Sequence, residues 1–254
     1  MNKPKLTAAA SRIGILVALS PTRTFAAINL SLALSALSGF GAQAQTTTYA
    51  TMAPIKQYLS ADPAGEIAQA RSAAPPAISD GAEVLVLGAH GYETAVKGKN
   101  GFVCLVQRAW FSDLDDGGFW NPKLRAPICF NPQGARSVLP TFLARSEWAM
   151  GGLTKAEMIN RTRAAIAAHT FAAPEIGTLT YMMAKDAYLG DRPHGHWHPH
   201  LMFYLPRMNT ADWGADQAHS PVMGSESAIE PYTIFYLPVT KWSDGTPDEA
   251  PPHL

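Results

Sequence analysis

Short apolar runs separated by glycine, asparagine and proline dominate the chain after residue 80 and predict a β-rich domain. Runs with strand character occupy 83–87, 92–96, 102–111, 128–130, 178–183, 200–205 and 232–239. Between the second and third runs, Asn100-Gly101 supplies the positive φ that a tight hairpin prefers. The first three strands are therefore expected to form an antiparallel meander.

Helix signals occur at three places in the chain. Asp62-Pro63 places an N-cap before a proline suited to the first helical position, which predicts a short helix over 64–72. A second helical region covers 136–150. Thr154-Lys155-Ala156-Glu157 is a capping box, and the helix that follows is expected to reach about residue 170.

The order of these elements predicts the fold class. Strands, then helices, then strands, without regular βαβ alternation, are typical of an α+β fold. We expect a mostly antiparallel sheet with two or three helices packed on one side, in a single domain after removal of a signal peptide. The predicted organisation is a secretory signal peptide at 1–44, an N-terminal lead-in segment with a short helix at 45–80, and an α+β domain at 81–254 with a frayed Pro-rich C-terminal tail.

The first 44 residues have the composition of an export signal. They contain four Lys or Arg and no Asp or Glu, an apolar stretch at 26–34, and small residues that end in Ala42-Gln43-Ala44. The alternative is an uncleaved membrane anchor, but the apolar stretch is shorter than the roughly 20 residues that a membrane span needs. We therefore expect a periplasmic or secreted protein with no stable membrane span after cleavage.

Removing this segment changes the charge of the chain. The whole sequence has 20 Lys and Arg against 20 Asp and Glu, so loss of four basic residues leaves 16 against 20, a net charge of about −4. An acidic chain with scattered basic residues does not suit a phosphate backbone. Nucleic acid is therefore not an expected partner.

The only two cysteines, Cys104 and Cys129, both follow the predicted cleavage site. In an oxidising compartment an even number of cysteines favours a disulfide, here one that closes a loop of about 25 residues. Both cysteines lie in apolar runs, so buried free thiols are the alternative.

Histidines supply the main candidate chemistry. Four of the chain's 8 histidines alternate within His194-Gly195-His196-Trp197-His198-Pro199-His200. In an extended chain alternate side chains share a face, and neighbouring imidazoles about 6.5 Å apart can converge on one metal ion. The first and last would lie roughly 20 Å apart. The candidate ligands His194, His196, His198 and His200 therefore cannot all serve one ion, and we favour His196 and His198 with His200 as a third.

Further ligands would have to come from elsewhere in the chain. The candidates are His90, Asp191, His219, Glu226 and Glu230. Imidazole with carboxylate suits Zn, Cu, Ni or Fe, and the sequence does not distinguish them. A metal-free alternative is that these histidines act as polar-capped aromatic groups at a sheet edge.

Gly190 with His196-Trp197-His198 resembles the opening of the first cupin motif. The glutamate that this motif needs a few residues later is absent, because Met202 and Phe203 occupy those positions. No second cupin motif is present, so the resemblance covers under a tenth of the chain.

Other motifs narrow the function further. The loop that starts at Asp113 lacks the twelfth-position glutamate of an EF-hand, and neither G-x-S-x-G nor a phosphate-binding glycine loop occurs. We expect an exported protein with a His-lined transition-metal site, as in a metal-dependent hydrolase or oxidase. The alternative is a metal-free periplasmic module that binds a small molecule or an envelope component.

Overall fold

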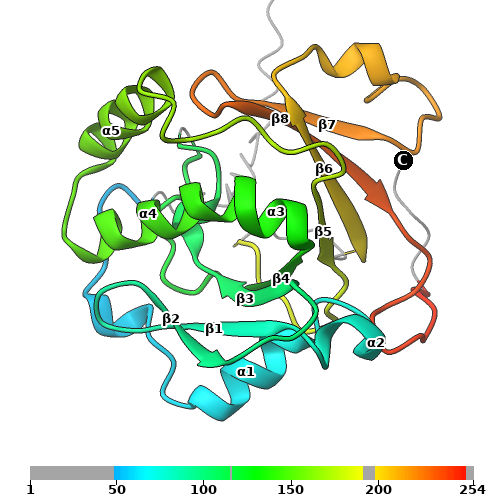
Figure 1. Cartoon of the computed structure of the whole chain (residues 1–254), viewed down its shortest axis with the longest axis horizontal. Coiled ribbons are helices and arrows are strands. Elements are labelled where there is room, and N and C mark those ends of the chain that lie inside the picture. Colours follow the sequence, from blue (N-terminus) through cyan, green and yellow to red (C-terminus); the bar gives the residue numbers. More distant parts are fainter. Residues whose placement is uncertain (1–48, 115, 191–197, 250–254) are drawn as a thin grey trace, which may run out of the picture. The chain divides into compact units, whose positions relative to one another are not determined.

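The structure, a computed structural model, describes residues 49–114, 116–190 and 198–249. These residues form an eight-stranded sheet with the strand order β2-β1-β3-β4-β5-β6-β8-β7 (Figure 1). The strands are β1 (Glu83–Leu87), β2 (Tyr92–Val96), β3 (Val103–Gln107), β4 (Ala126–Phe130), β5 (Leu179–Met182), β6 (His200–Pro206), β7 (Met223–Glu226) and β8 (Tyr232–Pro238). Every neighbouring pair is antiparallel except β1 and β3. The predicted α+β class with a mostly antiparallel sheet is confirmed.

Helices connect and cover these strands. They are α1 (Pro63–Arg71), α2 (Pro76–Ser79), α3 (Pro132–Ser137), α4 (Leu139–Met150) and α5 (Lys155–Ala167), with the short 3-10 helices η1 (Ile55–Gln57), η2 (Ala109–Phe111) and η3 (Thr210–Trp213). Two of the predicted helix N-caps are present in the structure. The Asp62 side chain accepts from the Gly65 amide at 3.0 Å, and Thr154 and Glu157 form the capping box of α5.

Helices lie on both faces of the sheet, whereas the sequence pattern predicted them on one. On one face Ala70 of α1 packs with Val84 and Cys104. On the other face Phe142 of α4 packs with Phe130. Four of the five residues of β3 and all five of β4 are buried, and strands buried on both faces need cover from two sides.

The first three strands do not form the predicted meander. Strand β1 lies between β2 and β3 and pairs with β3 in parallel, with Glu83 opposite Val103. The chain between β2 and β3 therefore crosses the end of β1 instead of making a tight hairpin at Asn100-Gly101. There the Asn100 amide donates to the Gly81 carbonyl at 3.3 Å. A Cβ at Gly98 would lie 2.3 Å from the Glu83 nitrogen, so this crossing requires glycine.

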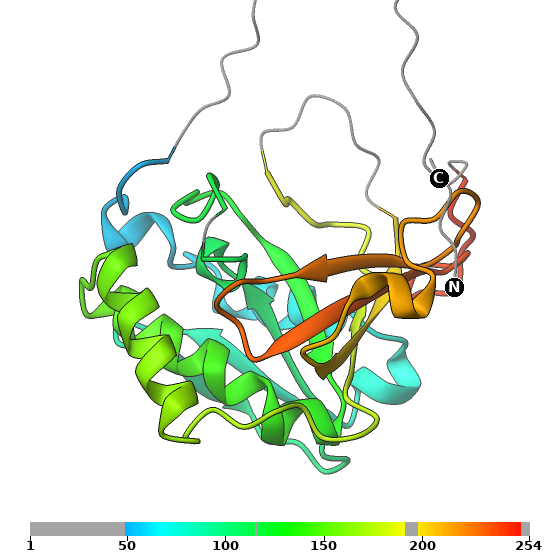
Figure 2. The same ribbon diagram turned by 90° about the horizontal axis from the view of Figure 1, so that it is seen from above.

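Two further elements differ from the sequence expectation. The run predicted as one strand over 102–111 ends at Gln107, and the chain turns into η2 after Arg108, whose guanidinium pairs with Glu66 at 2.8 Å. No strand was predicted between the runs 200–205 and 232–239, but this segment contains β7, which pairs with β8 at the sheet edge. Helix η3 lies beside β7 and β8 (Figure 2). Trp213 of η3 stacks on Phe235 of β8.

The two cysteines form the predicted disulfide. Cys104 of β3 and Cys129 of β4 are direct partners in the antiparallel register, with their Cα atoms 4.0 Å apart. Both side chains are buried beside α1, so the bridge joins two central strands under a helix.

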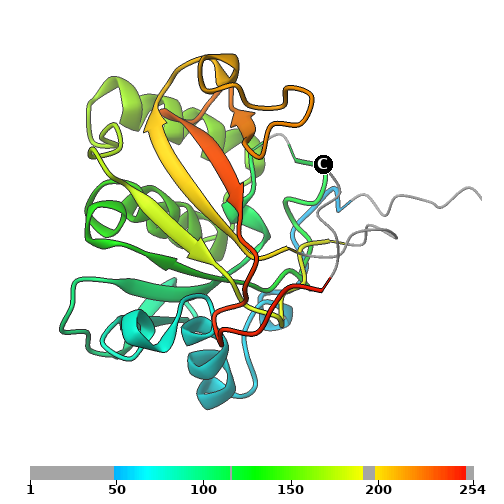
Figure 3. The same cartoon turned by 90° about the vertical axis from the view of Figure 1, so that its right-hand side faces the viewer.

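The tail after β8 is bonded to the sheet as far as the structure describes it, to residue 249. The Val239 amide donates to the Pro199 carbonyl at 2.9 Å, and the Ser243 amide donates to the Met183 carbonyl at 3.0 Å. Lys185 pairs with Asp244 at 2.6 Å. Figure 3 shows this segment in red, passing the end of the sheet close to α1. The fraying predicted from its prolines does not apply to residues 239–249.

Several loops meet at the end of the sheet where β6 begins. The register places Gln107 opposite Ala126, Met182 opposite His200, and His200 opposite Pro238. The segments that leave β3, β5 and β8 therefore lie at one end.

Residues 1–44, for which a signal peptide is predicted, lie outside the described residues. Within the described ranges no helix has the length and apolar character needed to cross a membrane.

Candidate functional site

Two of the four predicted histidine ligands can be placed. His194 and His196 lie outside the described residues, whereas His198 lies just before β6 and His200 is the first residue of β6. The His200 side chain is buried on the face of the sheet that also carries Met202 and Tyr204, because alternate residues of a strand share a face. The imidazoles therefore lie at the end of the sheet where the loops meet.

His198 is oriented by a carboxylate from the C-terminal tail. Its Nδ1 lies 2.6 Å from Oδ2 of Asp248, and the side chains are 20% and 5% exposed, respectively. The tail is held in place because the Asp248 amide donates to the Thr240 carbonyl at 2.9 Å. A carboxylate on Nδ1 fixes the ring orientation, so that a metal ion would be bound through Nε2.

His200 is oriented by the backbone next to it. Its Nδ1 lies 2.9 Å from the carbonyl oxygen of His198. A carbonyl can only accept, so Nδ1 carries the proton and Nε2 carries the lone pair. Burial lowers the pKa of His200; the hydrogen bond to His198 opposes this shift, and the charge of His198 adds to it. Neutral imidazole is the form that binds a metal ion or accepts a proton.

An aromatic and polar layer continues from the histidines along the same face of the sheet. The Tyr236 ring packs edge-on to His200, with ring centroids 5.8 Å apart. Burial, and secondarily the Asp113 carboxylate, raises the pKa of Tyr236 to about 12. The Ser225 hydroxyl donates to Asp113 at 3.3 Å. This face therefore holds the acidic side chain of Asp113 among hydroxyl groups of β7 and β8.

A buried ion pair supports the segment that carries Asp113. Arg145 of α4 pairs with Glu230, and the two side chains are 1% and 2% exposed. Arg145 also donates to the carbonyls of Trp110 and Ser112, both at 3.2 Å. The guanidinium thus ties the η2 region to α4 and to the start of β8.

The other predicted ligands are not brought to this site. His90 and His219 are exposed in turns elsewhere, Glu230 is paired with Arg145, and Glu226 accepts from the Thr210 amide at 2.7 Å. Asp191 lies outside the described residues. Among residues 49–114, 116–190 and 198–249, no group of three or more His, Cys, Asp or Glu side chains is placed to hold a metal ion.

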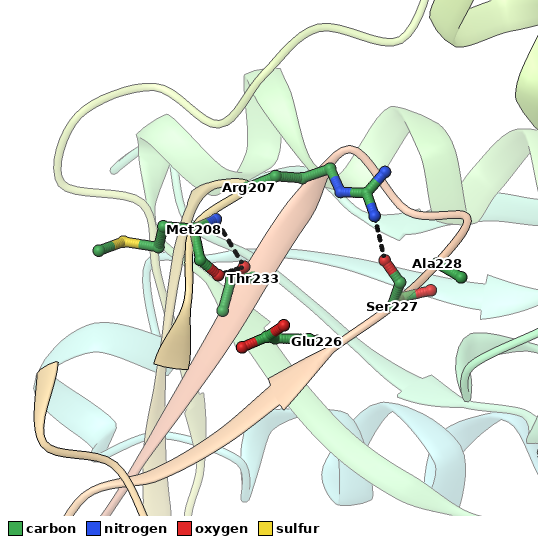
Figure 4. A pocket seen from close by; sticks show the side chains of 6 residues that line it. All are labelled: Arg207, Met208, Glu226, Ser227, Ala228 and Thr233. Atoms are coloured by element: carbon green, nitrogen blue, oxygen red, sulfur yellow. Dashed lines mark hydrogen bonds between the residues drawn. The ribbon is translucent and has the colours of Figure 1, made fainter. Parts of the chain in front are cut away.

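Neither His198 nor His200 lines either of two pockets, each of about 490 Å³. The first lies at the opposite end of β6 and is shown in Figure 4; its lining residues are Arg207, Met208, Glu226, Ser227, Ala228 and Thr233. The second lies between α1 and the tail and includes Gln69, Lys185 and Asp244.

Comparison with known proteins does not assign the site. No family model matches the chain, and no curated protein or solved structure is significantly similar to it. The open sheet, with β2 and β7 at its edges, also differs from the double-sheet jelly roll of cupins.

The sequence pattern indicated the histidines as candidate metal ligands but did not indicate the residues around them. Asp248 is 50 residues from His198 and lies in a Pro-rich segment without a motif. Asp113 stands in an acidic loop that resembles many solvated turns. The positions of Asp113 and Asp248 near the histidines depend on the pairing of β6, β7 and β8, which a single sequence does not specify.

Proposed function

We propose that this protein is an exported metal-binding protein in which His198 and His200 coordinate a transition-metal ion. The observation that carries the proposal is that Nδ1 of each ring is already held by a protein group, at 2.6 Å for His198 and 2.9 Å for His200. Histidines that bind metals typically donate the other ring nitrogen to a carboxylate or a backbone carbonyl in this way. Coordination would then use Nε2 of each ring.

The site would take Zn, Cu, Ni or Fe, the ions that imidazole ligands suit. Such an ion polarises a bound substrate or lowers the pKa of bound water, which is the chemistry of metal-dependent hydrolases and oxidases. In this proposal Asp248 fixes the orientation of the His198 ring, while burial lowers the pKa of His200 and so favours the neutral ring that binds metal.

The two imidazoles make a partial ligand set, because the described residues offer no group of three or more metal-binding side chains. A two-ligand protein site leaves coordination positions for water or substrate. The sequence-based prediction also names His194 and His196, and the experiment below tests His196 separately.

Export is supported by two independent features. The disulfide between Cys104 and Cys129 is of the kind that persists in oxidising compartments. The first 44 residues have the basic, apolar and small-residue order of a signal peptide. A periplasmic or secreted location is therefore part of the proposal.

Metal titration tests the proposal. Tag-free protein is stripped with a chelator and titrated by calorimetry with Zn²⁺, Cu²⁺, Ni²⁺ and Fe²⁺. We expect one ion per chain for at least one metal, and loss of that binding in His198→Ala/His200→Ala. Asp248→Asn should bind about 10- to 100-fold more weakly, the usual cost of losing a ligand's outer partner.

The control is His169→Asn, which removes an exposed histidine from the segment that follows α5 and should leave binding unchanged; asparagine tolerates the positive φ of this position. His196→Ala tests whether that histidine contributes. The proposal fails if the wild-type protein binds no ion stoichiometrically, or if the double variant keeps wild-type affinity. Circular dichroism of each variant confirms that it is folded.

A further inference from the structure

The pocket in Figure 4 lies at the end of β6 opposite to the histidines. Its floor is Thr233 of β8, which pairs with Leu205 on one side and with Glu226 on the other. Its walls come from Arg207 and Met208, which follow β6, and from the β7–β8 turn. A volume of about 490 Å³ lies within the range of small-molecule sites.

Arg207 is positioned by the backbone of the opposite wall. Its Nη2 donates to the Ser227 carbonyl at 2.9 Å, and Figure 4 shows the side chain extended toward that residue. One contact with a carbonyl uses one of the five N–H donors of a guanidinium and does not neutralise its charge. The remaining donors can form the paired hydrogen bonds that a carboxylate accepts.

Glu226 is positioned in the same way. Its Oε1 accepts from the Thr210 amide at 2.7 Å. This bond lowers the pKa of Glu226, with smaller contributions from the Thr210 hydroxyl and from the charge of Arg207. The carboxylate is therefore ionised at neutral pH and has further acceptor positions.

The two opposite charges are held apart in one pocket. Among the ion pairs of the described residues, none joins Arg207 to Glu226 within 4.0 Å. Each charge is instead fixed by a backbone group of a different segment. Two preset charges of opposite sign match a ligand that carries an anionic and a cationic group.

We propose that this pocket binds a small zwitterion, specifically a dipeptide with free ends, whose carboxylate contacts Arg207 and whose ammonium contacts Glu226. The volume exceeds the need of a single amino acid, and Ala228 gives the pocket an apolar lining for a methyl side chain. The Thr233 hydroxyl is already bonded to the Met208 amide and carbonyl, at 3.0 and 2.8 Å, so it shapes the floor and leaves recognition to the two charges.

This site is independent of the proposed metal site. His200 begins β6 and Pro206 ends it, so the two sites are separated by roughly 20 Å of strand. Metal binding and dipeptide binding can therefore fail separately, and each is measured by its own ligand.

Calorimetric titration with L-alanyl-L-alanine tests the proposal. The comparison ligands are N-acetyl-L-alanyl-L-alanine, which lacks the ammonium, and L-alanyl-L-alanine amide, which lacks the carboxylate. We expect the unmodified dipeptide to bind with one site per chain and each derivative to bind at least about tenfold more weakly, because each loses a charge-assisted contact.

Charge-removing variants locate the site. Glu226→Gln keeps an acceptor for the Thr210 amide and should lower dipeptide affinity about tenfold, while leaving affinity for the N-acetyl derivative unchanged. Arg207→Gln should likewise lower dipeptide affinity about tenfold, while leaving affinity for the amide derivative unchanged. The control is Arg163→Gln, which removes an exposed arginine on α5 and should leave dipeptide affinity unchanged. The proposal is overturned if the dipeptide does not bind, or if its affinity is the same in Glu226→Gln and Arg207→Gln as in the wild type.

Discussion

The buried pair of Arg145 and Glu230 gives the sharpest test of the packing. Glu230→Gln keeps the shape of the side chain but removes its charge, leaving a guanidinium that is 1% exposed without its counter-ion. Breaking a buried ion pair by removing one partner costs about 3–5 kcal/mol. Arg145 retains the Trp110 and Ser112 carbonyls, so we expect the lower end, about 3 kcal/mol.

For a domain of this size that loss lowers the Tm by roughly 6–12 °C. Urea unfolding monitored by tryptophan fluorescence gives the free energy directly. The matched control is Glu175→Gln, which breaks the pair with Arg136 at the surface, where the side chains are 42% and 59% exposed. Exposed pairs contribute little, so the control should leave the unfolding midpoint unchanged.

A double variant tests the reasoning behind that number. Arg145→Met/Glu230→Met removes both charges, so it should cost less than the sum of the two single substitutions, because neither charge is left buried alone. Additive effects, or a Glu230→Gln variant as stable as Glu175→Gln, would refute the interpretation of a desolvated and mutually dependent pair.

Two further predictions concern the strands beside the candidate site. Gly224→Ala should lower the free energy of unfolding in urea by about 1–3 kcal/mol, because a Cβ there would lie 2.4 Å from Cγ2 of Thr210. The control is Gly117→Ala, which has open space around it and should leave the free energy of unfolding unchanged. Equal effects of the two substitutions would contradict this packing. The raised pKa of Tyr236, about 12 against about 10 unfolded, provides stability below about pH 10 that is lost as the pH rises toward 12. Tyr236→Phe should show a shallower loss of unfolding free energy over that range, and an unchanged slope would show that Tyr236 does not contribute.

Local sequence patterns predicted much of the secondary structure. The aromatic and β-branched run at Tyr232–Pro238 is a strand, and the capping box at Thr154 begins α5. Patterns of this kind depend on a few neighbouring residues. The parallel pairing of β1 with β3 was not predicted, because it is decided by how the chain crosses the end of β1 near Gly98. The weak strand β7 was missed because Met-Gly-Ser-Glu carries little strand character of its own.

The same distinction applies to the candidate site. Alternating histidines are visible in the sequence, and the structure places His198 and His200 where β6 begins. Their orienting partners were not visible: Asp248 reaches His198 only through the path of the tail, and Tyr236 reaches His200 only through the β6–β8 register. The sequence could therefore indicate candidate residues, whereas it could not indicate their partners or their orientation.

The contact between His198 and Asp248 has a consequence for the order of assembly. The carboxylate belongs to the segment that follows β8, and β8 must pair with β6 before that segment can reach the imidazole. Contacts between residues far apart in sequence form late, after loop closure has been achieved. An incompletely folded chain would carry His198 without its orienting partner. Such a chain would lack the fixed imidazole, so the proposed metal site would form only as folding finishes.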